Sequence, residues 1–566
     1  MGAVLLLVAA IFSGCGYGIH LAGDQDAEAE NTTPDQADAQ IDVAEEYLDD
    51  STLDERPDIV IDSIDADRVE VDTADNADAL EEESLGACAN PPNPFDLVSP
   101  GEGELGVSYP TASFRWNETS DPDIGDRIAG YTLMIDEDPS FSSAYVKDGL
   151  DSNEYTLSSD DEALICGITY YWKVGATDTC DRTTWSDVRS FATKPTIAWT
   201  QTYNGLANGD DSGNDIAVGD TGNLYVIGTE YISGDYDNNI WITKYDTDGG
   251  PFWTQTYSSD GHYSDDSGSG ITVDNIGNVY ATGTNDLADI WVGKYDADGA
   301  PLWTQIDTGP IDQNNYGHDL AVDNIGNSFV ISTVDSNPGF GINFDIWIRK
   351  YNNGGTPIWL DSYDVGSLDQ GFGIAVDNSS CVYATGYVST IEEGWNIWIR
   401  KYNSSGVPNW TNTYNSPANG TDIGRAIAVD ISGNAYITGS TYVAESGEGA
   451  NIWIGKYNDS GTLIWDRTYN GVANDRDEGN GIATNNLGNI YVTGYETIIG
   501  EGRNIWITKY DTDGNPLCAQ TYNGPANGDD QGNGIAVDNT GNVYVTGYET
   551  VPGEGSNIWV REYLDF

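Results

Sequence analysis

The sequence predicts an all-β protein, and three observations lead to that prediction. Between residue 196 and the C-terminus, one segment recurs seven times at intervals of roughly 50–56 residues. Each full copy holds four strand-like runs, which is typical of one blade of a β-propeller. Seven shorter strand-like runs precede the repeats, so we predict a β-sandwich followed by a seven-bladed β-propeller. The copies open at Trp199, Trp253, Trp303, Trp359, Trp410, Trp465 and Cys518.

The chain begins with an apolar run, "MGAVLLLVAAIFSG", directly before Cys15. This run is too short for a membrane-spanning helix and is typical of a secretory signal peptide over residues 1–14. Its end, "FSGC", resembles the lipobox of bacterial lipoproteins, in which the cysteine becomes the lipidated N-terminus after cleavage. The resemblance implies lipidation of Cys15 and a location in the outer membrane or at the cell surface. An ordinary signal peptide is the alternative.

An acidic segment, residues 15–87, follows. Between Asp24 and Glu83 it contains 24 Asp and Glu residues, against the two cations Arg56 and Arg68. Low hydrophobicity combined with a high like charge leaves too little apolar surface to offset the entropy of ordering. We therefore expect a disordered linker between the lipid and the folded part, and we expect the lipid to be the only contact with the membrane.

Residues 88–194 form the predicted sandwich, because seven short strand-like runs with turn residues between them are typical of that architecture. In "TYYWKVGATD" the alternation places Tyr170, Trp172 and Val174 on one face of a strand. The run "YYWKV" and the later "WS…F.T" pattern resemble bacterial fibronectin type III domains. This resemblance covers the whole unit.

Export makes disulfides possible in this chain. In a seven-strand sandwich of this type, the N-terminus and the loop after the "TYYWKVGATD" strand lie at the same pole, so we pair Cys88 with Cys180. A strand of about eight residues holds Cys166 roughly 25 Å from Cys180, which exceeds the reach of a disulfide. We therefore expect Cys166 to be free. We also expect Cys381 and Cys518, which lie in different copies, not to meet.

The repeats also predict the order of strands from the propeller axis outwards. The "GIAV" strand has the smallest residues and should be innermost, followed by "VYVTGY", "NIWITKY" and "PLWTQTY", with the large Trp residues filling the widening wedge. A glycine three positions before every "IAV" run indicates a positive φ or a close backbone approach. These glycines are Gly213, Gly268, Gly317, Gly371, Gly424, Gly479 and Gly532.

The end of the chain predicts how the ring closes. The last copy stops at "NIWVREYLDF" and lacks an outer strand, whereas "TIAWTQTY" at 196–203 is a surplus strand ahead of the first copy. If these two pair, the last blade gains its fourth strand and no sheet edge stays open. Residues 195–566 are therefore a propeller closed by an N-terminal outer strand. The arrangement resembles the bacterial seven-bladed propeller repeat family, which implies a fold and surface exposure without a particular activity.

Loop lengths distinguish the two ends of the propeller. Counted from the axis outwards, the strands of a copy are the inner, second, third and outer strands. The turns from the inner to the second strand and from the third to the outer strand are short and nearly uniform, and we call their side the uniform end. The loops after the second and outer strands are longer and differ between copies, and their side is the variable end. Because binding usually resides in variable loops on a rigid scaffold, we expect it at the variable end. The closing strand should enter the ring at the uniform end.

Composition restricts the partners. A formal net charge of −70 and a pI near 4.1 exclude nucleic acid, because phosphate binding needs clustered Lys and Arg. Only three histidines are present, which argues against a multi-histidine metal site. An extracellular protein or glycan is the expected partner, and we expect a monomer.

Two sets of residues at the variable end are candidate binding groups. Aromatic loop residues are able to stack on sugars or anchor a protein, and they are Tyr231, Tyr236, Tyr263 and Trp395. Adjacent carboxylates in glycine-rich loops suit Ca²⁺, the only cofactor the sequence suggests; they are Asp210, Asp211, Asp529 and Asp530. The alternative is that these carboxylates accept hydrogen bonds from their own backbone amides. The "DxDG" turns, such as the one at Asp246, are expected to be tight turns.

No catalytic motif is present, so we predict a non-enzyme: a surface-exposed, lipid-anchored binding or adhesion scaffold. A propeller enzyme acting on extracellular glycans and a structural spacer are the alternatives. An enzyme should show a deep axial pocket with converging acids about 5–10 Å apart. A binder should instead show a broad, aromatic-bearing face.

Overall fold

The computed structural model describes residues 88–566, except 110–111, 159–160, 162–163, 165, 233–237, 260–264, 312–313, 338, 340–341, 367, 391–392, 444–448 and 565. The regular elements of this part are β-strands. It contains no helix long and apolar enough to cross a membrane. The predicted signal peptide, the lipidation site Cys15 and the acidic linker lie outside the described residues, and so do Tyr236 and Tyr263.

Two sheets precede the repeats, and we call them the two-sheet region. One sheet has the order β1 (Leu97–Ser99), β3 (Ser113–Trp116), β6 (Glu154–Thr156). The other has the order β9 (Arg189–Tyr203), β7 (Thr169–Asp178), β4 (Ile128–Asp136), β5 (Tyr145–Leu150), with β2 (Glu104–Tyr109) on β9 and β8 (Thr183–Trp185) on β7. Both sheets contribute to one hydrophobic core.

That core follows from the alternation in the sequence. Tyr170, Trp172 and Val174 are 6%, 0% and 0% exposed, so the face predicted for β7 is the buried one. Trp172 meets Phe114 of the opposite sheet edge to face, with ring centroids 5.1 Å apart. Aromatic pairs of this geometry add stabilisation beyond the area that they bury.

Six of the repeats form four consecutive antiparallel strands, and the last forms three that pair with β9 (Arg189–Tyr203). The first, or inner, strands are β10 (Ser212–Val218), β14 (Ser267–Val273), β18 (Tyr316–Val322), β22 (Gln370–Val376), β26 (Ile423–Val429), β30 (Glu478–Thr484) and β34 (Gln531–Val537). The second strands are β11 (Leu224–Tyr231), β15 (Val279–Thr284), β19 (Ser328–Asp335), β23 (Val382–Thr390), β27 (Ala435–Val443), β31 (Ile490–Ile498) and β35 (Val543–Val551).

The third and outer strands complete the sheets. The third strands are β12 (Asn238–Tyr245), β16 (Ile290–Tyr295), β20 (Phe344–Tyr351), β24 (Gly394–Tyr402), β28 (Gly449–Tyr457), β32 (Gly502–Tyr510) and β36 (Gly555–Leu564). The outer strands are β13 (Pro251–Tyr257), β17 (Pro301–Asp307), β21 (Pro357–Tyr363), β25 (Pro408–Tyr414), β29 (Leu463–Tyr469) and β33 (Pro516–Tyr522). Six four-stranded sheets result, and β34, β35 and β36 continue into β9 as a further four-stranded set.

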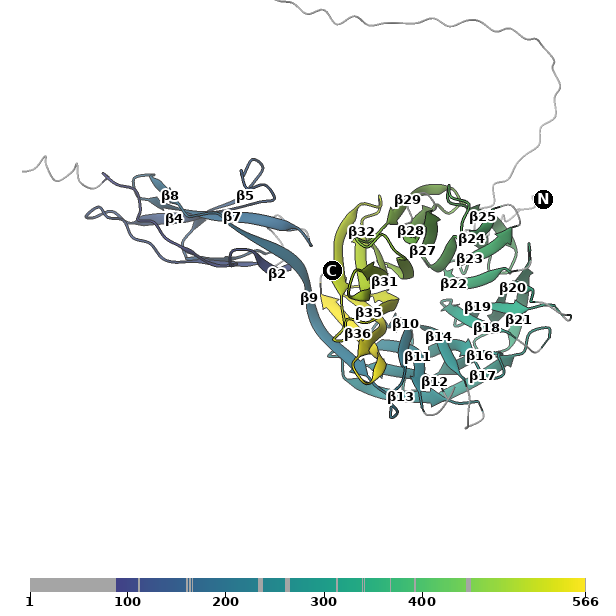
Figure 1. Cartoon of the computed structure of the whole chain (residues 1–566). Helices are drawn as coiled ribbons and strands as arrows, with labels where there is room; N and C mark the ends of the chain where they lie inside the picture. Colours follow the sequence, from purple (N-terminus) through teal and green to yellow (C-terminus); the bar gives the residue numbers. More distant parts are fainter. Residues whose placement is uncertain are drawn as a thin grey trace, which may run out of the picture. The chain divides into compact units, whose positions relative to one another are not determined.

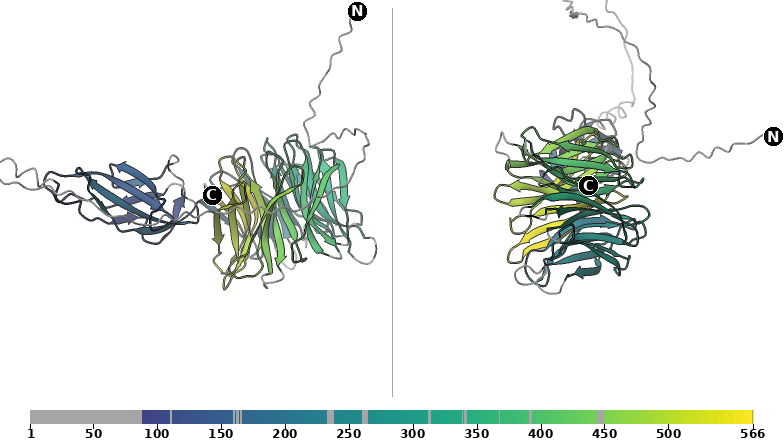
Figure 2. Two further views of the ribbon diagram at one scale, coloured as in Figure 1. Left: turned by 90° about the horizontal axis from the view of Figure 1, so that it is seen from above. Right: turned by 90° about the vertical axis from the view of Figure 1, so that its right-hand side faces the viewer.

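These sheets stand side by side in a closed ring (Figure 1). Each inner strand contacts the inner strands of the sheets on both sides, and β34 contacts β10. In the edge-on views the strands run between the two faces of the ring (Figure 2). The molecule therefore has a propeller arrangement, with the predicted inner strands nearest the axis.

Strand β9 joins the two parts of the fold. Its first half pairs with β7 and β2 in the two-sheet region, over residues 189–195. Its second half pairs with β36, with Thr196 opposite Leu564 and Tyr203 opposite Ile558. This is the predicted closing strand. Because Leu564 lies where the third strand ends, β9 enters the ring at the uniform end, as expected.

The large side chains fill the spaces between sheets. The Trp residues of the third strands are almost all buried, for example Trp241 at 1% and Trp398 at 0% exposure. The outer-strand Trp residues are half-buried and pack on the neighbouring uniform turn, where a Cβ on Gly249 would lie 2.5 Å from the Trp199 ring. That glycine has φ of 79°, and Asp246 Oδ1 accepts hydrogen bonds from the backbone of its own turn. The "DxDG" sequence is therefore a tight turn, as predicted.

The glycine shared by all inner strands is explained by close approach. It has no positive φ in any copy. A Cβ on Gly268 would lie 2.5 Å from Ile227 Cγ1 of the preceding sheet, and one on Gly317 would lie 2.5 Å from the Gly283 carbonyl. Only glycine therefore lets neighbouring sheets come this close at the axis.

One expectation about the cysteines was wrong. Cys166 is disulfide-bonded to Cys518, with Cα atoms 4.8 Å apart. The length of the strand between Cys166 and Cys180 excludes a bond between these two cysteines, but it says nothing about contacts of Cys166 with the repeats. Cys518 replaces the outer-strand Trp in β33, and both cysteines are 4% exposed in one hydrophobic cluster. Cys88 and Cys180 are each disulfide-bonded, and their pairing with one another stays a prediction.

Candidate functional site

A β-bulge in every inner strand places one residue at the axis. The register of each inner strand shifts between the shared glycine and the residue two positions later, which leaves the residue between them without a cross-strand partner. Bulges redirect a side chain in this way. We call these the bulge residues, and they are Asn214, Ser269, His318, Phe372, Arg425, Asn480 and Asn533.

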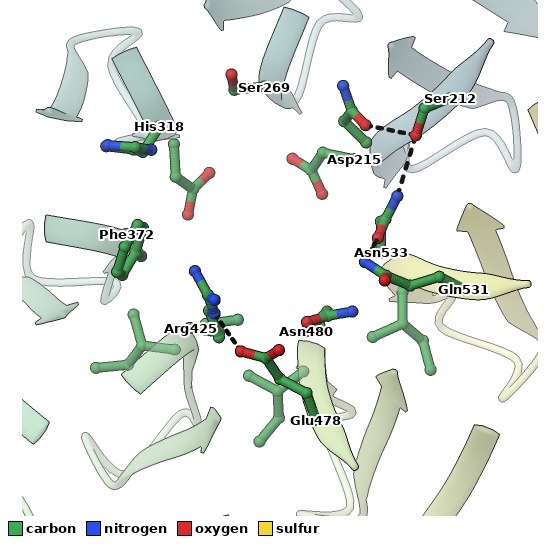
Figure 3. Close-up of a pocket in the computed structure, with 18 of the residues that line it drawn as sticks. Ser212, Asp215, Ser269, His318, Phe372, Arg425, Glu478, Asn480, Gln531 and Asn533 are labelled. Carbon is green, nitrogen blue, oxygen red and sulfur yellow. Dashed lines mark hydrogen bonds and ion pairs between the residues drawn. The ribbon is translucent and has the colours of Figure 1, made fainter. Parts of the chain in front are cut away.

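All of the bulge residues line one cavity of about 480 Å³, the axial pocket. Figure 3 shows their side chains arranged around the axis. The pocket lies where the inner strands begin, which is the end of the ring that the long, variable loops supply. Its volume lies within the range of small-molecule sites.

The bulge residues differ in chemistry although their surroundings repeat. Glycine precedes each of them, and an "IAV"-like run begins two positions later in every copy. The seven bulge residues themselves are three Asn, one Ser, one His, one Phe and one Arg. A role in packing alone would favour one residue type at equivalent positions, so this diversity indicates recognition.

The three Asn residues fasten one side of the ring. Asn480 Nδ2 donates to the Gly532 carbonyl of the next sheet at 2.9 Å. Asn533 Nδ2 donates to the Gly213 carbonyl at 2.9 Å, and Asn214 Nδ2 donates to the Gly268 carbonyl at 2.7 Å. The same type of hydrogen bond, from an Asn side chain to a glycine carbonyl, thus joins sheets that follow one another in the sequence and also joins the last sheet to the first.

The opposite side presents a charged and aromatic cluster. Arg425 Nε lies 2.7 Å from Glu478 Oε1, and its guanidinium lies 4.8 Å from the centre of the Phe372 ring (Figure 3). Arg476 also pairs with Glu478, at 3.0 Å. His318 meets Phe372 edge to face at 5.0 Å. Desolvation and the charge of Arg425 lower the pKa of His318 to about 3, so this imidazole is neutral at ordinary pH.

Two carboxylates, Asp215 and Asp319, also line the pocket. Burial raises the pKa of both, and the charge of Asp319 raises that of Asp215 further. Asp215 Oδ2 accepts a hydrogen bond from the Ile271 amide at 2.8 Å. Asp319 accepts from the Leu320 and Ile374 amides at 2.7 and 3.0 Å. Two buried acids thus line the axial pocket, and the oxygens named here accept hydrogen bonds from the backbone of the inner strands.

Two of the predicted aromatic residues are described, and both lie at the variable end. Trp395 is half-buried and stacks on Tyr387 at 4.4 Å with an interplanar angle of 8°. Tyr387 in turn contacts Phe372 of the axial pocket at 5.9 Å. Tyr231 lies against Gly209, and its backbone amide donates to Asp211. Trp395 is thus connected to the pocket through two ring contacts.

The predicted calcium ligands bind backbone amides. Asp211 is fully buried and accepts from the Gly205 and Tyr231 amides at 2.8 and 2.7 Å. Asp530 accepts from the Gly524 and Thr550 amides in the same way. Asp210 and Asp529 accept from the amides of Ser556 and Arg503, which belong to the neighbouring third strands. This geometry favours the alternative interpretation of these acids as loop clamps, and calcium at this end stays a prediction.

The pocket residues were missed by the sequence reasoning, although a signal was present. The position after the shared glycine holds five residue types in seven copies, although the glycine before it is constant and the apolar run two positions later is nearly so. The prediction placed binding in loops, whereas a bulge is able to project a strand residue into a cavity.

Comparison with known proteins supports a propeller. The family model described as β-propeller repeat matches residues 416–444 and 521–548. None of the curated proteins matches the chain.

Several solved structures are similar to parts of the chain. Sqt1 from Chaetomium thermophilum is 13% identical, with a TM-score of 0.37, over 61% of this chain and 83% of its own. A luciferin-regenerating enzyme is 12% identical, with a TM-score of 0.33, over 64% and 94%. A puromycin hydrolase is 12% identical, with a TM-score of 0.41, over 62% and 53%. At these TM-scores the likenesses carry no inference about ligand or activity.

Proposed function

We propose that this protein is an exported, lipid-anchored scaffold that binds an extracellular glycan or protein at the variable end of a seven-bladed propeller. In this proposal the two-sheet region is a fibronectin type III-like sandwich, and with the acidic linker it separates the propeller from the membrane. The axial pocket receives the group of the ligand that decides specificity.

The chemical diversity of the bulge residues is the observation that carries this proposal. The three Asn residues fasten neighbouring sheets, whereas Ser269, His318, Phe372 and Arg425 differ in chemistry at equivalent positions that line one cavity. An aromatic face at Phe372, the guanidinium of Arg425 and several amide and hydroxyl groups are the mixture that orients a polar small ligand. Hydroxyl-rich groups suit it best, so a glycan end is favoured over an apolar peptide.

The test is a glycan and protein array probed with the purified protein, followed by titration of the best hit. Arg425→Gln removes the cation of the pocket, and we expect affinity to fall by about tenfold or more. Arg127→Gln removes the same charge from an exposed site in the two-sheet region and serves as the control. Equal affinity of the two variants for the hit would refute binding at the axial pocket.

Glycan hydrolysis is the second candidate, because Asp215 and Asp319 have raised pKa values in the same pocket. A pair of carboxylates is what glycosidases use. The test is hydrolysis of the glycans that the array identifies, with Asp319→Asn as the variant. Turnover that Asp319→Asn abolishes would establish the enzyme, and binding without turnover would leave the scaffold as the function. The absence of both binding and turnover would favour a structural spacer.

A further inference from the structure

Three aspartates of the two-sheet region, far along the chain from the axial pocket, converge on one point. Asp121 and Asp126 belong to the loop between β3 and β4, and Asp178 is the last residue of β7. One oxygen from each carboxylate lies within 4.8 Å of the others. Two oxygens bound to a single Ca²⁺ at 2.3–2.6 Å are at most about 5 Å apart. The spacing therefore fits a shared cation.

Each of these carboxylates has one oxygen that is satisfied and one that is not. The Oδ1 atom of Asp121 accepts from the Asp123 amide at 2.8 Å. Asp126 Oδ1 accepts from the amides of Arg127 and Thr179 and from the Thr179 hydroxyl. Asp178 Oδ1 accepts from the amides of Cys180 and Arg182, both at 2.8 Å. These bonds fix the orientation of all three groups.

The three Oδ2 atoms are buried and have no hydrogen-bond partner among the residues that the structure describes. The side chain of Asp178 is 0% exposed, so its second oxygen cannot turn to water. A buried carboxylate oxygen without a partner is costly, and structures rarely keep one without an ion or a water. An unpartnered oxygen on each of three carboxylates that approach one another is a second observation, independent of the acidic character of the cluster.

Arg182 supplies only part of the missing positive charge. Its Nε lies 3.4 Å from Asp178 Oδ2, and its Nη2 lies 3.6 Å from Asp123 Oδ2, without hydrogen-bond geometry at either contact. Four carboxylates therefore face one guanidinium.

We propose that Asp121, Asp126 and Asp178 bind a Ca²⁺ ion that ties the β3–β4 loop to the end of β7. All three ligands are hard carboxylate oxygens, which Ca²⁺ prefers and which it accepts in irregular geometry. Mg²⁺ demands a near-ideal octahedron and keeps most of its water, so a site with buried ligand oxygens selects against it.

The experiment is calorimetric titration of the purified full chain with CaCl₂ after chelation, at constant ionic strength, with MgCl₂ for comparison. We expect saturable calcium binding that Asp126→Asn weakens by about tenfold or more. Asn keeps the Oδ1 acceptor of residue 126, so the loop should still fold. Asp187→Asn removes the same charge from an exposed position of the two-sheet region and should leave the affinity unchanged.

Two further variants make the result specific. Arg182→Gln removes the competing cation, so it should tighten calcium binding. A double variant, Asp210→Asn with Asp529→Asn, removes acids of the variable end and should preserve this binding event. No saturable calcium binding by the wild type, or binding that Asp126→Asn leaves unchanged, would overturn the proposal. Loss of binding in Arg182→Gln with an unchanged melting temperature in chelator would also overturn it.

Discussion

Asp345 offers a test of how burial and charge limit the stability of this acidic ring. The side chain lies in the third strand β20 and is 7% exposed. Burial, together with the charges of Asp364 and Asp369, raises the pKa of this carboxyl to about 6. Five other copies place an uncharged Asn at this position: Asn239, Asn396, Asn451, Asn504 and Asn557. Asp345→Asn is therefore a substitution that the repeats themselves accommodate.

The magnitude follows from the two pKa values. In the unfolded chain the carboxyl titrates near 3.8, and in the folded protein near 6. The folded state thus binds the proton more tightly, and stability falls as the pH rises from about 4 to above 6. A difference of about 2 units corresponds to about 3 kcal/mol at most. Asn does not titrate, so the variant should be more stable than the wild type above pH 6, by up to that amount, and equally stable near pH 4.

The assay is urea denaturation followed by tryptophan fluorescence at several pH values between 4 and 8. Other buried acids, such as Asp369, also have raised pKa values and make both proteins less stable at high pH. The difference between variant and wild type isolates residue 345. Asp248→Asn removes the same charge from an exposed uniform turn and should change little. A stability difference that does not depend on pH, or a variant less stable at pH 7, would refute the reasoning.

Four more predictions concern the fold and the anchor. Replacing both Cys166 and Cys518 by Ser should lower the free energy of unfolding by about 2–4 kcal/mol, because the bond spans 352 residues; reductant should then affect the wild type more than this variant in denaturation curves. Gly532→Ala should cost about 1–3 kcal/mol because its Cβ would collide with Thr493 Oγ1, whereas Gly101→Ala has room; thermal melts compare them. Deleting residues 195–204 should expose the edge of β36 and promote association, measured by light scattering. Cys15→Ser should move the protein from membranes to the soluble fraction, and a wild type that is already soluble would contradict lipidation.

Much of the fold was predictable because the seven copies of the repeat can be compared with one another within the one chain. Seven copies with different loops show which positions are fixed, so the strand order and the closure by residues 196–203 were predictable from sequence. The buried face of β7 followed from period-two alternation at Tyr170, Trp172 and Val174. In each case a local pattern was enough, because the relevant contacts recur or lie within one element.

The rest depended on contacts between elements that no local pattern records. Cys166 meets Cys518 although 352 residues separate them, and the repeat showed only that a Trp was missing. The bulge residues are strand residues by pattern, and the shift in register that turns them to the axis is visible only in three dimensions. The convergence of Asp178 with the β3–β4 loop likewise depends on the packing of the two-sheet region.

A ring of nearly identical sheets is symmetric, whereas a ligand is not. The chain keeps the glycine and the apolar run of each inner strand nearly constant and varies the two residues between them, of which the first is the bulge residue. On one side of the pocket, the side-chain amides of Asn480, Asn533 and Asn214 each donate to a backbone carbonyl of the next sheet. The bond from Asn533 joins the last sheet to the first and so helps to hold the ring closed. On the other side the guanidinium of Arg425 lies over the Phe372 ring, and both side chains line the cavity. The side that the Asn residues fasten sets the width of the pocket. The side with Arg425 and Phe372 makes the pocket asymmetric, so a ligand is able to bind in one orientation.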